Sequence, residues 1–152
     1  MQSINENTID YINRGYSHKF LDNILDDLNK RGIKYILHVI FGLPGESHKD
    51  MLDSIKYVRE KDAFGIKIHN LYIQKDSPIY NEYLKGKIDL LSKDAYTDLV
   101  VEAIKILDGK VVIHRITGDG EKSKLVAPLW AADKLSVIGE INHKLKLENI
   151  KI

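Results

Sequence analysis

Apolar residues recur every three or four positions in several segments of the chain, the spacing of a helix with one buried face. After Ser17, two neighbouring rows of apolar residues follow this spacing and predict a helix that ends at Gly32: Phe20, Ile24 and Leu28 in one row, and Leu21 and Leu25 in the next. Further helices are expected over residues 4–13 and in the segments after Ser47, Ser92 and Pro128.

Three shorter apolar runs separate these helices and are predicted to be strands: residues 33–41, 65–73 and 110–114. Alternation of helix and strand is typical of a parallel sheet with right-handed crossovers. Because three parallel strands leave two open edges and much uncovered apolar surface, the expected fold class is α/β, a partial (βα) barrel of about three parallel strands with flanking helices. The open sheet edge also predicts pairing with a second copy, as a homodimer.

Composition narrows the classes of function. The 152 residues are enough for one domain, and a net charge of +1 gives no overall attraction to nucleic acid or membrane. The chain has no cysteine, which excludes disulfides, thiolate zinc sites and any iron–sulfur cluster ligated by thiolates of this chain. It has no apolar run of membrane-spanning length and no signal-peptide pattern, so a cytoplasmic protein is expected.

The densest group of chemically versatile side chains follows the apolar residues 111–113, and its sequence is His114-Arg115-Ile116-Thr117-Gly118-Asp119-Gly120-Glu121. Loops at the carboxyl ends of parallel strands are where α/β folds place their ligands, so a binding or catalytic loop is predicted. The alternative is a polar turn in which the glycines serve only to reach positive φ.

A second candidate loop, residues 42–47, joins a strand to a helix N-terminus, where free amides suit an anion or a polar ligand. It lacks the Gly-Lys-Ser/Thr ending of a P-loop and the glycine spacing of a dinucleotide fingerprint. A structural turn and a ligand loop are both open interpretations. The lysines, among them Lys122, Lys124, Lys144 and Lys146, are scattered and indicate a solvated surface.

Polar residues also interrupt the predicted strands. His38 is either a core histidine or a group facing a barrel lumen, and Lys67 and His69 share one face of the next strand, which we assign to the lumen. His38, His69 and His114 come from three successive strands, so a three-histidine metal site is conceivable.

Several of these segments resemble radical S-adenosylmethionine (radical-SAM) enzymes. Residues 40–46 (Ile-Phe-Gly-Leu-Pro-Gly-Glu) resemble the fifth-strand motif of that superfamily, while residues 1–3 and 12–15 look like the end of the fourth strand and the helix after it. Residues 65–69 and 114–120 are similar to the YhcC/YtqA-like group in particular. The resemblance runs from the first residues to the last helix.

The resemblance implies that residues 1–152 form a single domain, the C-terminal half of a (βα)6 barrel plus the C-terminal helix of the family. The intact enzyme would use S-adenosylmethionine and a [4Fe–4S] cluster, whose cysteines lie after the first strand and therefore in a missing N-terminal half. The chain would then be a fragment or the product of a truncated gene, inactive by itself, with that half as its partner. The rival interpretations are a stand-alone α/β module that binds a small anionic ligand and a partner chain that completes a barrel.

The resemblance also assigns residues. In relatives such as the oxygen-independent coproporphyrinogen oxidases, S-adenosylmethionine is contacted by residues that match Gln2, Arg14 and His38, although the last position is usually acidic there. Ile40 and the turn of residues 42–45 would line the adenine. The cofactor-binding set that the resemblance implies is therefore Gln2, Arg14, His38, Ile40, Gly42, Leu43, Pro44 and Gly45. The substrate-facing set is Lys67, His69, His114, Arg115 and Asp119. No metal ligand is assigned in this chain, and the substrate could be a tRNA base, a small metabolite or a peptide.

Overall fold

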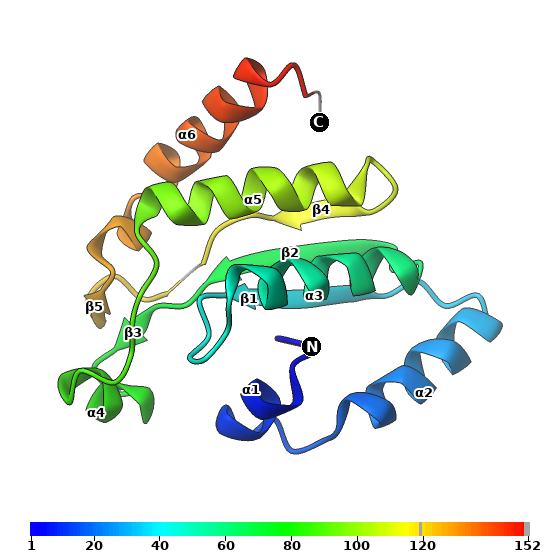
Figure 1. Ribbon diagram of the computed structural model, residues 1–152, viewed down its shortest axis with the longest axis horizontal. Coiled ribbons are helices and arrows are strands. Elements are labelled where there is room, and N and C mark those ends of the chain that lie inside the picture. Colours follow the sequence, from blue (N-terminus) through cyan, green and yellow to red (C-terminus); the bar gives the residue numbers. More distant parts are fainter. Residues whose placement is uncertain (119, 151–152) are drawn as a thin grey trace.

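The core of the protein is a parallel sheet of three strands, which the computed structural model places in the order β1-β2-β4 (Figure 1). The strands are β1 (Ile36–Phe41), β2 (Gly65–Asn70) and β4 (Val112–Arg115), and both pairings are parallel. The structure describes residues 1–118 and 120–150. The expected fold class, an α/β partial barrel with three parallel strands and flanking helices, is confirmed.

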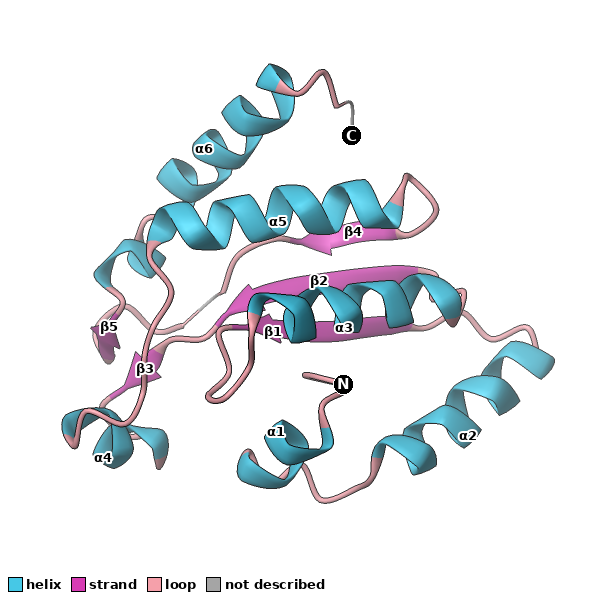
Figure 2. Ribbon diagram, in the orientation of Figure 1, coloured by secondary structure: helices cyan, strands magenta, loops and turns pink. Residues whose placement is uncertain are grey.

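Two long helices, α3 (His48–Glu60) and α5 (Lys93–Leu107), cover one face of this sheet (Figure 2). The core between them and the sheet holds Phe41, Ile66 and Ile68, none of which is exposed. Both helices begin where the sequence predicts: the side chain of Ser47 accepts from the N–H of Asp50 in a full capping box, and that of Ser92 accepts from an amide three residues on.

Three further helices flank this unit: α1 (Glu6–Tyr11), α2 (His18–Lys30) and α6 (Lys134–Leu147). On α2, the prediction of a wide buried face is partly wrong. Leu21 and Leu25 are buried, but Phe20 is 55% and Ile24 41% exposed. The helix lies beside the sheet rather than over it (Figure 1), so one row of side chains is enough to attach it.

A second, antiparallel sheet of two short strands, β3 (Ile73–Gln74) and β5 (Leu125–Ala127), lies at the carboxyl end of the parallel strands, next to α4 (Ile79–Leu84) (Figure 1). The predicted strand over 65–73 is therefore wrong in its extent, because it breaks after Asn70. There the N–H of Leu71 donates to the carbonyl of Phe41 across 2.8 Å, and the chain turns into the second sheet. A 3-10 helix, η1 (Leu129–Ala132), joins β5 to α6.

Three other strand boundaries differ from prediction, one of them the start of the third strand, which lies at Val112 rather than at Lys110. The first strand begins at Ile36 rather than at Ile33, whose side chain is 49% exposed. The third strand extends to Arg115, so His114 and Arg115 belong to β4 and only the residues after them form the loop.

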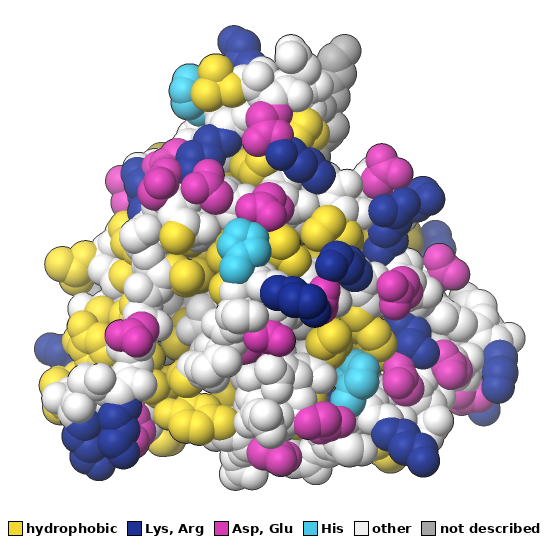
Figure 3. Space-filling view, in the orientation of Figure 1, with side chains coloured by type: hydrophobic (Ala, Val, Ile, Leu, Met, Phe, Trp, Pro, Cys, Tyr) yellow, Lys and Arg dark blue, Asp and Glu magenta, His cyan; other side chains and the backbone are white. Residues whose placement is uncertain are grey.

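Acidic and basic side chains are interspersed over the face shown in Figure 3, as expected for a chain with nearly balanced charge. Within residues 1–118 and 120–150, none of the helices has the length and apolar character needed to cross a bilayer.

Candidate functional site

The face of the sheet opposite α3 and α5 carries the polar residues of the strands. Alternate residues of β1 and β2 pack into the core, so His38 on β1 and Lys67 and His69 on β2 lie on the other face. The rings of His38 and His69 are 5.9 Å apart between centroids. In a barrel this is the face that lines the lumen.

Positive charge gathers on this face around His38. Partial burial lowers the pKa of His38, and the positive charges of Lys67, the chain's amino terminus and Arg115 lower it further. The pKa below the usual range favours the neutral imidazole at neutral pH. This surface therefore favours an anionic or hydrogen-bonding ligand over a cation.

The N-terminal segment runs beside the free edge of β1. The backbone N–H of Ile40 donates to the carbonyl of Gln2 across 3.0 Å, which aligns residues 1–3 with the strand. Arg14, from the turn after α1, donates through Nη1 to the carbonyl of Ser3 across 3.0 Å, and its guanidinium lies 4.5 Å from the centroid of the Tyr16 ring. The fold thus brings Gln2 and Arg14 to the same edge as Ile40.

Two side-chain atoms at this edge have unused hydrogen-bonding capacity. Gln2 Oε1 and Arg14 Nη2 are buried and have no hydrogen-bond partner among the described residues. An acceptor and a charged donor left unsatisfied in a folded protein each cost free energy. The fold therefore leaves one amide acceptor and one guanidinium donor without a protein partner among the described residues.

The loop 42–46 follows β1 directly. Gly42 and Gly45 both have positive φ, of 85° and 82°, and the N–H of Glu46 donates to the carbonyl of Leu43 across 3.1 Å. The glycines are therefore required by the turn itself. Leu43 is buried, whereas Pro44 is partly exposed.

Glu46 is a site residue that sequence reasoning missed. Its carboxylate accepts from the hydroxyl of Ser3, which is fully buried. Burial raises the pKa of Glu46, partly opposed by hydrogen bonds from Ser3 and Thr8. Glu46 thereby ties the loop 42–46 to the N-terminal segment and to Arg14, which binds the other side of Ser3.

The loop after β4 is held by residues from two other elements. Asn70 Oδ1 at the end of β2 accepts from the N–H of Gly118 across 3.1 Å, and the hydroxyl of Tyr96 on α5 donates to the carbonyl of Ile116 across 2.9 Å. The ring of Tyr72 lies so close that a Cβ at Gly118 would sit 2.9 Å from it, and one at Gly120 2.6 Å.

This packing corrects one interpretation of the glycines. Gly118 does not adopt a positive φ, so it is required by the close approach of Tyr72 rather than by turn conformation. Sequence reasoning missed Asn70, Tyr72 and Tyr96. The only signal was a polar residue within the predicted apolar strand 65–73, at Asn70.

The predicted substrate-facing residues do not all lie close together in the structure. His114 lies over Gly65, where a Cβ would be 2.5 Å from its ring, and its ring centroid is 6.1 Å from that of Phe64. Gly65 begins β2, so His114 is near the amino end of the sheet, while Arg115 pairs in register with Lys67. Asp119 lies outside the described residues. In the part of the chain that the structure describes, no group of three His, Cys, Asp or Glu side chains is placed to hold a metal ion.

Comparison with known proteins agrees with this geometry. Residues 63–147 match the family described as the Radical_SAM C-terminal domain. The chain is 37% identical to YtqA of Bacillus subtilis over 146 residues and 28% identical to YhcC of Escherichia coli over 151. These alignments cover 96% and 99% of this chain but only 45% and 49% of the relatives, so the chain spans about half their length.

Among solved structures, Elp3 of the archaeon Methanocaldococcus infernus, with residues 1–46 deleted, superposes with a TM-score of 0.77. That match covers 99% of this chain and 35% of Elp3, and at 17% identity it concerns the fold alone. The family match covers more than half of the chain, and the resemblance seen in the sequence is confirmed. The chain belongs to the radical-SAM C-terminal domain family.

Proposed function

We propose that this chain is the part of a radical-SAM iron–sulfur enzyme that binds S-adenosylmethionine and substrate, and that the N-terminal half of the barrel carries the cluster cysteines. Membership of the family supports this, as does the open polar face, which a second half-barrel would cover. The proposal includes the domain assignment of residues 1–152 as the C-terminal half of a (βα)6 barrel with the family's last helix.

The observation that carries the cofactor assignment is the pair of unsatisfied atoms, Gln2 Oε1 and Arg14 Nη2. S-adenosylmethionine has an ammonium group that can donate to an amide oxygen, and it has a carboxylate and ribose hydroxyls that can accept from a guanidinium. The residues present therefore fit the cofactor. Ile40 and residues 42–45 complete the proposed cofactor-binding set, with the turn beside the adenine.

Bound in the intact enzyme, S-adenosylmethionine and the [4Fe–4S] cluster would supply the hydrogen-abstraction chemistry that the protein itself lacks. Residues of this chain orient the nucleoside and exclude water. His38, held neutral, can accept or donate one hydrogen bond at this face, and Lys67 and Arg115 add charge that favours a substrate with anionic or acceptor groups.

Calorimetric titration of the chain with S-adenosylmethionine tests the cofactor assignment. We expect binding, and we expect Gln2→Met, which keeps the length of the side chain and removes the acceptor, to weaken it about tenfold. The matched control is Gln74→Met on β3, away from the N-terminal edge. A chain that does not bind the cofactor, or a Gln2→Met variant that binds as tightly as the parent, would refute the assignment.

A genomic test addresses the missing half. We expect the DNA upstream of the Met1 codon, or a gene nearby, to encode βα units with a three-cysteine motif. The chain alone, reconstituted anaerobically with iron and sulfide, should yield neither cluster absorbance nor 5′-deoxyadenosine. Cluster absorbance or 5′-deoxyadenosine from this chain alone would contradict the proposal that the N-terminal half carries the cluster.

A further inference from the structure

The helix α2 carries exposed apolar side chains along one side. Phe20 and Ile24 are four residues apart, so they lie next to each other on the helix surface, and both are exposed. We call these two residues the α2 row. Tyr16, just before the helix, extends the row: it is 37% exposed, and its ring centroid lies 6.2 Å from that of Phe20. Exposed apolar side chains that adjoin one another are typical of a surface that binds another element.

The contacts between α2 and α3 fix the direction in which the α2 row points. The carboxylate of Asp22 accepts from the hydroxyl of Tyr57 on α3 across 2.7 Å. Lys61, at the end of α3, binds Asp22 at 3.0 Å and Asp26 at 2.9 Å. Successive residues of an α-helix are about 100° apart around its axis, so the α2 row lies nearly opposite these two carboxylates. The row therefore points away from α3.

The order of the helices indicates what would lie on that side. Figure 1 shows α5, α3 and α2 in succession, with α2 furthest toward the side of β1. In the chain, α3 lies between the parallel strands β1 and β2, and α5 lies between β2 and β4. The helix α2 has the same place between residues 1–3, which lie beside β1, and β1 itself. Because such crossovers share one hand, a preceding strand–helix unit would place its helix beyond α2, against the α2 row.

The relatives contain enough chain for such a unit. This chain covers less than half of YtqA and of YhcC, so more than half of each relative lies outside the match. Residues 63–147 match a C-terminal domain, which favours the N-terminal side for the part outside the match. An N-terminal half would therefore approach the molecule from the edge at which α2 lies.

We propose that the α2 row binds an amphipathic helix of the N-terminal half of the barrel, the helix that comes before residues 1–3. That helix presents apolar side chains spaced three or four residues apart. Asp27 and Arg31, on the same side of α2 as the row, bind each other at 2.9 Å and form a polar rim at its end. The inference rests on the proposed function, because it requires the N-terminal half.

Co-expression of this chain with the part of Bacillus subtilis YtqA that lies outside the match tests the proposal, since neither half then has to fold alone. Sedimentation velocity over a dilution series should show a one-to-one complex. Phe20→Gln and Ile24→Gln should each raise its dissociation constant about five- to tenfold, because each variant has less apolar area to bury.

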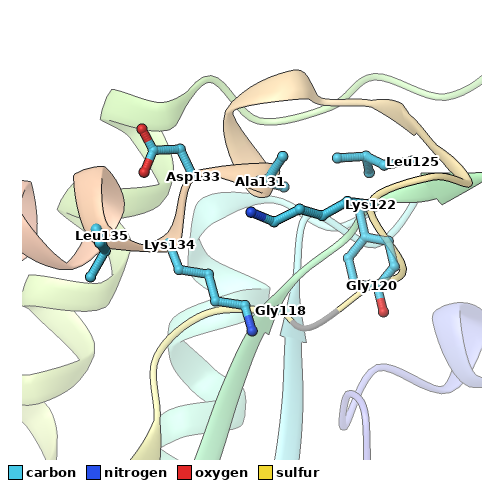
Figure 4. A pocket seen from close by; sticks show the side chains of 10 residues that line it. Gly118, Gly120, Lys122, Leu125, Ala131, Asp133, Lys134 and Leu135 are labelled. Carbon is cyan, nitrogen blue, oxygen red and sulfur yellow. The ribbon is translucent and has the colours of Figure 1, made fainter.

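The matched control is Leu135→Gln on α6, at the other edge of the sheet (Figure 1). Leu135 is 83% exposed and lines a pocket between the loop after β4 and the start of α6 (Figure 4). The control should change the dissociation constant less than twofold. In the isolated chain, both α2 variants should keep the parent's melting temperature, because the side chains that they replace are already exposed.

An unchanged dissociation constant in Phe20→Gln and Ile24→Gln would overturn the proposal, and so would failure of the parent chain to form the complex. If the parent chain alone sediments as a dimer that Phe20→Gln dissociates, a second copy covers the α2 row and the assigned partner is wrong. Both α2 variants should bind S-adenosylmethionine as the parent does. Absence of that binding in the parent refutes the proposed function, whereas an ineffective α2 row refutes this inference alone.

Discussion

Asn70 accepts a hydrogen bond through Oδ1 from the backbone N–H of Gly118 across 3.1 Å, which joins the end of β2 to the loop after β4. Asn70 is 4% exposed, and its Nδ2 donates to the carbonyl of Leu71 across 3.2 Å. Both ends of the amide are therefore used. The loop that carries Gly118 and the turn that carries Tyr72 form one unit at the carboxyl end of the sheet.

We expect Gly118→Ala to disrupt this unit. The new Cβ would lie 2.9 Å from Tyr72 Cε1 and 3.1 Å from Asn70 Oδ1, closer than such atoms approach without movement. The free energy of unfolding, measured in urea, should fall by about 1–3 kcal/mol. The matched control is Gly139→Ala on α6, where nothing lies within 4 Å of the new Cβ. It should raise the same quantity by up to about 1 kcal/mol. Equal signs for the two variants would contradict the role given to Tyr72.

Tyr96→Phe isolates a second support of the same loop. The Tyr96 ring is fully buried against Phe41 and Trp130, and phenylalanine keeps those contacts. The variant loses the 2.9 Å hydrogen bond to the carbonyl of Ile116 and leaves that acceptor unsatisfied. A loss of about 1–2 kcal/mol in unfolding free energy is expected, together with faster amide exchange in residues 116–118. Tyr80→Phe, at a residue of α4, is the control and should have little effect.

Much of the parallel sheet could be predicted because its signals are local. A serine cap followed by helical spacing fixes the start of α3 and α5 within a few residues, and continuous apolar runs mark β1 and β2. The parallel direction of the strands then follows from the alternation of helix and strand.

The second sheet could not be predicted in this way. Its strands, β3 and β5, have two and three residues and lie about fifty positions apart in the chain, too short and too distant for any periodicity to reveal. The contacts that hold the loop after β4 could not be predicted either. Asn70, Tyr72 and Tyr96 matter through contacts with residues 116–120, which depend on the fold rather than on spacing.

Removing the charge of Lys67 should raise the pKa of His38. Positive charges from Lys67, the amino terminus and Arg115 disfavour the imidazolium, so Lys67→Gln relieves one of them, while the contribution of burial stays. An NMR titration of the His38 ring should show a pKa closer to the ordinary value than in the parent. Lys49→Gln, on the outer side of α3, is the control. An unchanged His38 pKa in Lys67→Gln would show that the two side chains do not share one face electrostatically.

Glu46 makes stability depend on pH in the opposite sense to a typical carboxylate. Burial raises its pKa in the folded protein above the ordinary 4.5, so the folded state holds the proton more tightly than the unfolded state. The stabilisation this gives is complete below pH 4.5 and is lost as the pH rises through the folded-state pKa. Burial therefore makes the ionised form of Glu46 destabilising, and the hydrogen bonds from Ser3 and Thr8 oppose this only in part.

Glu46→Gln removes that ionisation and keeps an acceptor for Ser3. Its melting temperature should exceed that of the parent at pH 7, and the gap should narrow as the pH falls toward 4, because the parent then regains its own stabilisation. The control is Glu60→Gln, at an exposed position of α3. Its melting temperature should differ little from that of the parent, and the difference should not narrow in this way as the pH falls. If the gap for Glu46→Gln instead widened toward low pH, the carboxylate would be stabilised by its ionised form. Ser3 and Thr8 would then outweigh burial at the junction between the loop 42–46 and the N-terminal segment.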